Sequence, residues 1–132
     1  LFITADHGQV SVGDNLVALS KEVTSLIEFQ SGEPRFRWLH ARQGASRELF
    51  QAAKEQFESL AWVMSADEVV NEGWFGPKVT KAARTRFGDV ALVAREPVAF
   101  LDAAEVMSIE LICRHGSLTA DEMYVPAISM VT

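Results

Sequence analysis

The chain has 132 residues, of which 48% are hydrophobic and 23% charged, and its formal net charge is −6. This size and apolar content predict one compact globular domain, or part of one, and exclude a disordered or collagen-like chain. Eighteen acidic residues oppose twelve basic ones, so the field around the molecule repels phosphate backbones and argues against nucleic-acid binding.

The chain opens on an apolar segment, Leu1–Ala5, that predicts a short buried strand. The polar cluster Asp6-His7-Gly8 ends it, and the glycine permits a sharp turn. Because a sheet strand begins at the first residue and no signal-peptide pattern is visible, we expect a piece of a longer protein or a processed product. A mean hydropathy of +0.09 is slightly apolar for a domain this small, which predicts a surface that another part of the protein covers.

The next region predicts a small strand, helix, strand unit from about 34 to 64. Ser20 is placed to cap a short helix beginning at Lys21, and residues 31–34 are typical of a turn. Apolar residues then alternate over 36–40, as in a strand. Ser46 is the expected N-cap of an amphipathic helix whose buried face is Leu49, Phe50, Ala53, Phe57 and Leu60. The strand 61–64 completes an element in which the helix covers one face of the sheet.

We therefore expect an α/β fold in which residues 1–132 form one domain part and about 34–78 a peripheral α/β subdomain. Within it, Ser65 is expected to cap a short helix over 67–71 that Gly73 ends. The loop 73–77 carries two large aromatic residues, and the basic stretch 78–86 is typical of a solvated face.

The last third predicts strands over 90–94 and 98–101 and a final strand over 125–132. Thr119 is placed to cap a helical turn that runs to Met123. The one cysteine, Cys113, cannot form an internal disulfide and lies in the apolar run 109–113 like a small buried hydrophobe. All apolar runs are far shorter than the ~20 residues of a membrane-spanning helix, so we expect no membrane partner.

Two polar clusters are candidates for chemistry: Asp6-His7-Gly8, and His115-Gly116 near the other end of the chain. Each follows an apolar segment, and such positions at the mouth of an α/β sheet often bind ligands. Carboxylate and imidazole suit zinc. Taken alone, the pattern is weak, because histidines in small domains are more often structural. His40, inside an alternating strand, is interpreted as structural.

No nucleophile is obvious from the sequence. Thr4, Ser117 and Cys113 lie close to the two clusters, but each has an ordinary structural role available. None occupies a Gly-x-Ser-x-Gly elbow or a phosphate-binding loop.

Several motifs occur in a fixed order along nearly the whole chain. They are Phe2–Gly8 (FITADHG), Gly73–Pro77 (GWFGP), Arg86–Val90 (RFGDV), His115–Met123 (HGSLTADEM) and Val125–Pro126. In this order they resemble the C-terminal part of an alkaline-phosphatase-superfamily enzyme of the type I phosphodiesterase/nucleotide pyrophosphatase family, in the form found as predicted hydrolases of bacteria. The fold that this resemblance implies is a C-terminal fragment of an alkaline-phosphatase-like α/β sheet.

The resemblance implies zinc-dependent hydrolysis of a phosphate ester or nucleotide. In that family two zinc ions, or other divalent metals in their place, flank a phosphoryl group that a Thr or Ser attacks in line. Asp6 and His7 would then be ligands of the ion that activates the nucleophile, and His115 a ligand of the second ion. The nucleophile and three further ligands belong to the family's N-terminal portion. We therefore expect this chain to be inactive alone, with that missing half of the same protein as its partner.

Two other interpretations stay open at this stage. The chain could be a small non-catalytic α/β binding or interaction module in which Asp6, His7 and His115 are structural. Sulfatases, phosphomutases and phosphonate hydrolases use similar ligands, so the substrate within the superfamily is not fixed. Trp74 and Phe75 are substrate-side candidates that would equally fill a seam between subdomains. An uncovered apolar face would also allow the chain to dimerise.

Overall fold

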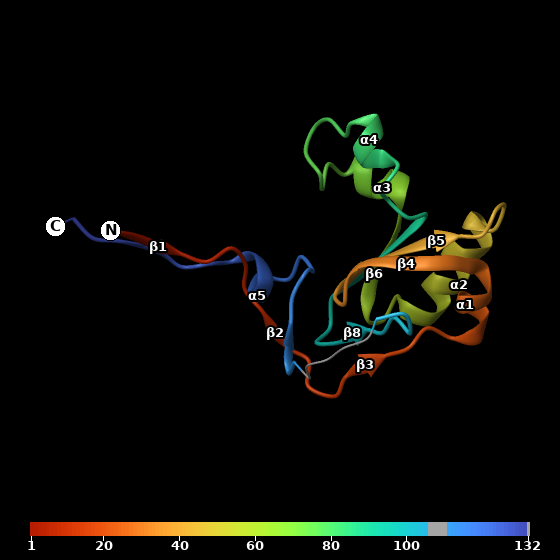
Figure 1. Ribbon diagram of the computed structural model, residues 1–132, viewed down its shortest axis with the longest axis horizontal. Helices are drawn as coiled ribbons and strands as arrows, with labels where there is room; N and C mark the ends of the chain where they lie inside the picture. Colours follow the sequence, from red (N-terminus) through yellow and green to blue (C-terminus); the bar gives the residue numbers. More distant parts are fainter. Residues whose placement is uncertain (106–110, 132) are drawn as a thin grey trace.

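The computed structural model describes residues 1–105 and 111–131 (Figure 1). The architecture is mixed α/β, as predicted, with five described helices and four small sheets. The helices are α1 (Lys21–Leu26), α2 (Ser46–Phe57), α3 (Ala66–Asn71), α4 (Lys81–Arg84) and α5 (Ala120–Met123). The strands are β1 (Phe2–Thr4), β2 (Val10–Ser11), β3 (Leu16–Val17), β4 (Ile27–Glu33), β5 (Phe36–Ala41), β6 (Ala61–Ser65), β7 (Val90–Ala94), β8 (Ala99–Phe100), β9 (Cys113–Arg114) and β10 (Ala127–Ser129).

The main body is a four-stranded sheet in the order β4-β5-β7-β6, with antiparallel neighbours throughout. Helix α2 connects β5 to β6, so the predicted strand, helix, strand unit exists, with β7 inserted between its two strands. The predicted turn over 31–34 is wrong, because Ser31, Gly32 and Glu33 pair with β5 and the turn tightens to Pro34 and Arg35. Gly32 lies within the paired segment of β4 with φ +94°, a backbone conformation that glycine adopts without steric cost.

Both faces of this sheet are covered (Figure 1). On one face Leu49, Ala53 and Phe57 of α2 pack with buried residues such as Leu39 and Leu92. The opposite face carries a second cluster, Trp38, Ala66, Val69, Ala91 and Val93, which includes residues of α3. Strand β7 is buried along its whole length, which is why it has an uninterrupted apolar sequence.

Three of the four residues predicted as caps occupy the N-cap position: Ser20, Ser65 and Thr119, of which Thr119 bonds to the Glu122 side chain and not to the helix backbone. Ser20 caps α1 by accepting from the Val23 N–H, and Ser65 forms a reciprocal capping box with Glu68 in α3. Ser46 is not the cap of α2: Ala45 occupies that position, and the Ser46 hydroxyl donates to Asp89 Oδ1 at 2.6 Å. Because the Ser46 hydroxyl bonds to the Asp89 carboxylate, it does not cap the helix backbone.

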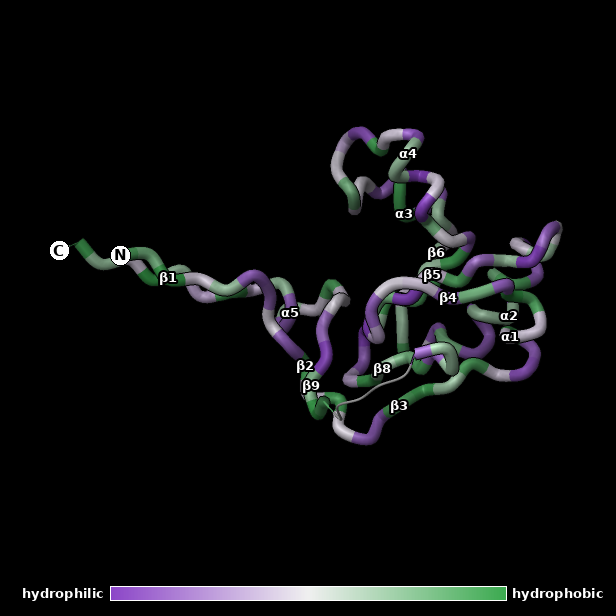
Figure 2. The backbone as a smooth tube through the Cα atoms, viewed as in Figure 1, coloured by the Kyte–Doolittle hydropathy of each residue, from purple (hydrophilic) through white to green (hydrophobic). Residues whose placement is uncertain are grey.

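Strands β1 and β10 form a separate two-stranded ribbon that projects from the body with both termini at its tip (Figure 1). Ile3 pairs with Ile128, and their side chains share one face, whereas Phe2 lies on the other. Phe2 is 65% exposed and Ile128 56% exposed, and Figure 2 shows the apolar character of the ribbon's outer part. The prediction that Leu1–Ala5 is buried is therefore wrong in this structure.

Two short strand pairs, β2 with β9 and β3 with β8, connect the ribbon to the sheet. Leu111 and Ile112 are exposed and Cys113 is half-buried, so the expected burial of this run is wrong for 111–112. Residues 109–110 and Thr132 of the predicted elements lie outside the described residues. No helix in the described ranges is long and apolar enough to cross a membrane.

Candidate metal centre

The two histidines singled out from opposite ends of the sequence lie in contact. The rings of His7 and His115 stack with their centroids 3.8 Å apart and their planes 17° from parallel. Local pairing explains this meeting: Val10 pairs with Arg114 and Ser11 with Cys113, which brings the segment after His7 beside the segment before His115. The fold therefore joins residues 108 positions apart.

A backbone hydrogen bond fixes the tautomer of His7. Its Nδ1 lies 2.8 Å from the carbonyl oxygen of Gly8. A carbonyl oxygen only accepts, so Nδ1 carries a proton, and in the neutral ring the lone pair is on Nε2. Metal-ligating histidines are commonly oriented by this kind of bond.

Asp6 lies beside that lone pair. Its Oδ2 is 3.7 Å from His7 Nε2, and its Oδ1 accepts the His7 backbone N–H at 3.1 Å. Two ligands of a tetrahedral zinc ion with bonds of about 2 Å lie roughly 3.3 Å apart. The separation of these donor atoms is close to that value. Asp6 is 89% exposed and His7 36% exposed, so both are accessible to an ion from solvent.

The glycine after each histidine occupies a crowded position. Gly8 donates its N–H to the Glu122 carbonyl at 2.8 Å, and a Cβ there would overlap the carbonyl oxygen of Asp121. Gly116 has φ +115°, and a Cβ there would lie 2.7 Å from Glu33 Cβ. Both histidine loops therefore depend on glycine for their close approach to neighbouring segments, the Asp121 backbone at Gly8 and the Glu33 side chain at Gly116.

Glu122 is a buried carboxylate that sequence reasoning missed. It accepts from Arg35 Nε at 2.8 Å and Nη2 at 2.9 Å, from the Ser117 N–H at 2.9 Å and from the Thr119 hydroxyl at 2.5 Å. Burial raises the pKa of the Glu122 carboxyl, but the Arg35, Thr119 and Ser117 hydrogen bonds outweigh it and hold the pKa below its usual range. Nothing in the sequence marks this pair, because its members lie 87 positions apart.

The stacked rings do not form a single-ion site. Lone pairs of imidazoles lie in the ring planes, so two nearly parallel rings cannot converge on one ion. In agreement, no three His, Cys, Asp or Glu side chains among residues 1–105 and 111–131 gather in a group that could hold one metal.

A cavity of about 270 Å³ lies beside His115. It is lined by Gln9, Glu33, Pro34, Leu111, Cys113, Arg114 and His115. It is bounded by the turn between β4 and β5 and by β9, the same elements that support the His115 loop.

The two aromatic candidates of the 73–77 loop pack against the sheet body. Trp74 meets Phe36 edge-on at 6.4 Å, and its indole N–H donates to Glu72. Phe75 lies 4.7 Å from Phe87. These contacts give both rings a packing role, and a role on the substrate side stays a prediction.

The remaining candidates have local hydrogen-bond partners. His40 Nε2 is 2.8 Å from the Ser31 hydroxyl, and its ring stacks on Phe29 at 3.9 Å. Burial lowers the pKa of His40, while Asp89 opposes that effect. The Ser117 hydroxyl donates to the Ala94 carbonyl, and the exposed Thr4 hydroxyl bonds to the Ala5 carbonyl at 3.4 Å. None of these groups is arranged as an activated nucleophile.

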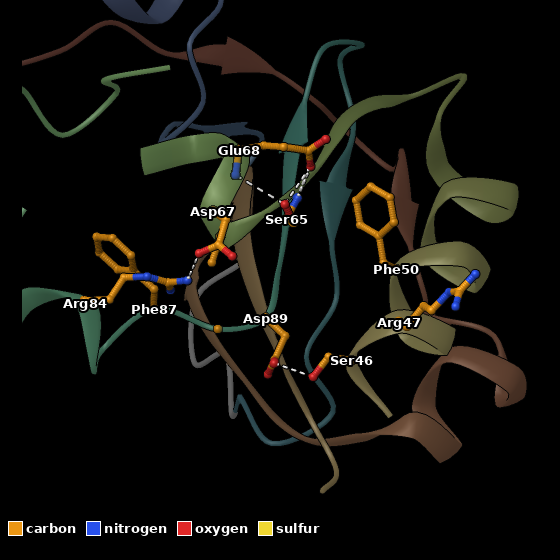
Figure 3. A pocket seen from close by; sticks show the side chains of 11 residues that line it. Ser46, Arg47, Phe50, Ser65, Asp67, Glu68, Arg84, Phe87 and Asp89 are labelled. Atoms are coloured by element: carbon orange, nitrogen blue, oxygen red, sulfur yellow. Dashed lines mark hydrogen bonds and ion pairs between the residues drawn. The ribbon is translucent and has the colours of Figure 1, made fainter. Parts of the chain in front are cut away.

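A larger cavity, of about 520 Å³, lies between the N-terminal ends of α2 and α3 (Figure 3). Most of its polar side chains bond to one another: Ser46 donates to Asp89, Ser65 to Glu68 and Arg84 to Asp67. Neither histidine of the stacked pair lines it. It is therefore a groove between structural contacts and not an extension of the histidine site.

Comparisons with known proteins add no assignment. No family model matches this chain. No curated protein matches it either. The information on function therefore lies in the geometry of the histidine site.

Proposed function

We propose that this chain supplies metal ligands to a zinc-dependent phosphoric ester hydrolase of the phosphodiesterase/nucleotide pyrophosphatase type. The observation that carries the proposal is the stacking of His7 on His115 at 3.8 Å. These are two of the three residues that the family resemblance selects as ligands, and chance gives no reason for them to meet across 108 positions. A phosphate ester or nucleotide is the proposed substrate class.

The donor chemistry fits zinc, or another divalent ion with similar preferences. Asp6 and His7 would hold one ion through a carboxylate oxygen and Nε2, and His115 would hold the second. Such ions act as Lewis acids on the phosphoryl oxygens and stabilise both the entering and the leaving oxygen. The Gly8 carbonyl accepts from Nδ1 of His7, so Nε2 is the ring nitrogen that would face an ion.

The attacking group is proposed to come from polypeptide outside residues 1–132, as the resemblance implies. Ser117, the hydroxyl nearest His115 in sequence, is buried and bonded to the Ala94 carbonyl. With three donors divided between two ions, the chain should hold zinc weakly and have little or no hydrolase activity alone.

The exposed ribbon supports a further polypeptide as partner. The chain exposes 8652 Å², whereas a compact protein of its 14.6 kDa mass exposes about 6,900 Å². The excess of about 1,700 Å² exceeds the ~800 Å² that one partner contributes to a standard interface. Apolar side chains occupy both faces of the ribbon, as in strands that lie between two layers. We propose that the segment carrying the other ligands covers it.

The partner proposal has a direct test. Sedimentation measures the oligomeric state of the isolated chain. It therefore distinguishes a chain that dimerises through the ribbon from a monomer whose ribbon is free to bind another segment. Concentration-dependent dimers that Ile3→Lys abolishes would mean that a second copy covers the ribbon in solution. A monomer that instead binds the upstream segment of its own gene product, when co-expressed, supports the proposal.

A non-catalytic interaction module is the second candidate. The exposed apolar side chains of β1 and β10 favour it, because such a surface is typical of a binding face. In that case His7 and His115 would only pack against each other, and replacing either would leave zinc binding unchanged.

Zinc titration by calorimetry tests the hydrolase proposal. We expect binding that weakens at least about tenfold in both His7→Ala and His115→Ala. His40→Ala is the matched control and should bind like the parent chain, since His40 bonds to Ser31 away from the stacked pair. Equal binding in all four proteins, or none at millimolar zinc, would contradict the assignment.

A further inference from the structure

Glu122 lies at the junction of three segments of the chain. Its backbone carbonyl accepts from Gly8 in the first histidine loop at 2.8 Å. Its carboxylate accepts from the Ser117 N–H in the second histidine loop at 2.9 Å and from the Arg35 side chain in the turn before β5. Glu122 is only 3% exposed, so all of these bonds form away from water.

Two of these bonds act within two positions of a proposed ligand. Gly8 follows His7 directly, and Ser117 is two residues after His115. The Thr119 hydroxyl adds a third bond on the same side of Glu122. Glu122 therefore bonds to the backbone of both histidine loops, to the first through its own carbonyl and to the second through its carboxylate.

Arg35 anchors this arrangement to the sheet body. It is fully buried, and its Nη1 donates to the carbonyls of Glu96 at 2.9 Å and Val98 at 2.8 Å. Its Nε and Nη2 are both directed at Glu122. A guanidinium fixed on two sides in this way orients the carboxylate that it binds.

A second buried arginine, Arg37, also binds a carboxylate but does not contact either histidine loop. Arg37 binds Glu105 through two contacts of 2.5 Å and also donates to the Gly32 and Phe100 carbonyls. None of these partners belongs to a histidine loop. The Arg37 pair thus has similar chemistry and a purely structural position.

We propose that Glu122 is a positioning residue for the metal centre: anchored by Arg35, it holds the His7 and His115 loops together on the sheet. The zinc-affinity part rests on the proposed function, whereas the alignment of the two rings does not. Replacing the carboxylate should separate or reorient the rings even where the sheet body stays folded.

Glu122→Gln tests this proposal, with Glu105→Gln as the matched control. In the metal-free chain, imidazole NMR signals report the mutual ring-current shifts and cross-ring contacts of His7 and His115. We expect these to be lost in Glu122→Gln and kept in Glu105→Gln. Zinc affinity should fall about 10- to 100-fold only in the Glu122 variant. Thr119→Val, which removes a single hydrogen bond, should shift the same signals less and serves if Glu122→Gln does not fold.

The outcomes separate the two proposals. Unchanged histidine signals in folded Glu122→Gln, with a loss of melting temperature equal to that of Glu105→Gln, would overturn the positioning role. Lost ring contacts in Glu122→Gln would support it, even if the parent chain bound no zinc and the hydrolase proposal failed.

Discussion

Strand β7 of the four-stranded sheet and strand β1 of the ribbon are both mainly apolar, yet only β7 is buried. Strand β7 lies between α2 and the α3 side and is fully buried. Strand β1 has one neighbour, β10, and all three of its residues are exposed. Apolar sequence is therefore buried only where a second layer reaches it. In this molecule the sheet body contains the two buried apolar clusters, and the ribbon leaves its apolar side chains exposed.

Truncation of an aromatic residue in each region should give the largest contrast. Phe57 is fully buried beside Phe100, so Phe57→Ala should lower the free energy of unfolding by about 3–5 kcal/mol. Phe2→Ala removes a side chain that is mostly in water and should change it by less than about 0.5 kcal/mol. Urea denaturation of both variants measures the difference. Equal losses would mean that the ribbon folds against the body.

Acid should lower the stability of the sheet body by protonating Glu105 and Glu122, the two carboxylates that bind its buried arginines. Hydrogen bonds from Arg37 lower the pKa of Glu105, and those from Arg35 and its neighbours outweigh burial to lower the pKa of Glu122. A folded pKa below the ordinary value of 4.5 stabilises the protein above that pH, and the contribution is lost as the pH falls through the folded value.

Thermal melts between about pH 6 and pH 3 measure this dependence. The parent chain should lose melting temperature steadily below about pH 4.5. Glu122→Gln and Glu105→Gln, which cannot ionise there, should each start lower and decline less. A variant curve parallel to that of the parent would show that the carboxylate has the same pKa folded and unfolded.

Helix capping gives the smallest expected effect. Ser65→Ala removes the hydroxyl that accepts from the Glu68 N–H, while the Ser65 backbone N–H bond to the Glu68 carboxylate is kept, and should cost about 1 kcal/mol. The same box lowers the pKa of Glu68, mainly through the bond from the Ser65 backbone N–H. Thr80→Ala, at the start of the exposed α4, is the comparison and should cost less because no buried residue depends on that helix. Chemical denaturation measures the loss of unfolding free energy in each variant. A larger loss in Thr80→Ala than in Ser65→Ala would contradict this expectation.

Local sequence patterns predicted α2 and β5 of the sheet body but not the edge strand β4 or the cap of α2. Helical spacing after Ser46 and alternation over 36–40 gave α2 and β5, since both follow from short-range periodicity. Strand β4 was missed because Gly32 and Pro34 resemble a turn, and only pairing with β5 extends the strand through Glu33. Ser46 was assigned as a cap because the sequence does not show that Asp89 would take its hydroxyl.

The candidate site divides in the same way. Asp6, His7 and His115 were found from residue type and resemblance, and the structure brings the two histidines together. Glu122 and Arg35 were not found, because their pairing depends on tertiary contacts across 87 positions. The exposure of Leu1–Ala5 was also unforeseen, since an apolar pattern predicts burial without saying which layer provides it.

The most direct test of the histidine metal centre is a zinc titration followed by NMR of the imidazole nitrogens. The chain has only three histidines, so each gives an assignable signal. We predict that zinc shifts Nε2 of His7 and a ring nitrogen of His115, while His40 stays unchanged beside Ser31. Shifts confined to His40, or absent from both stacked rings at saturating zinc, would contradict the proposal that His7 and His115 are metal ligands.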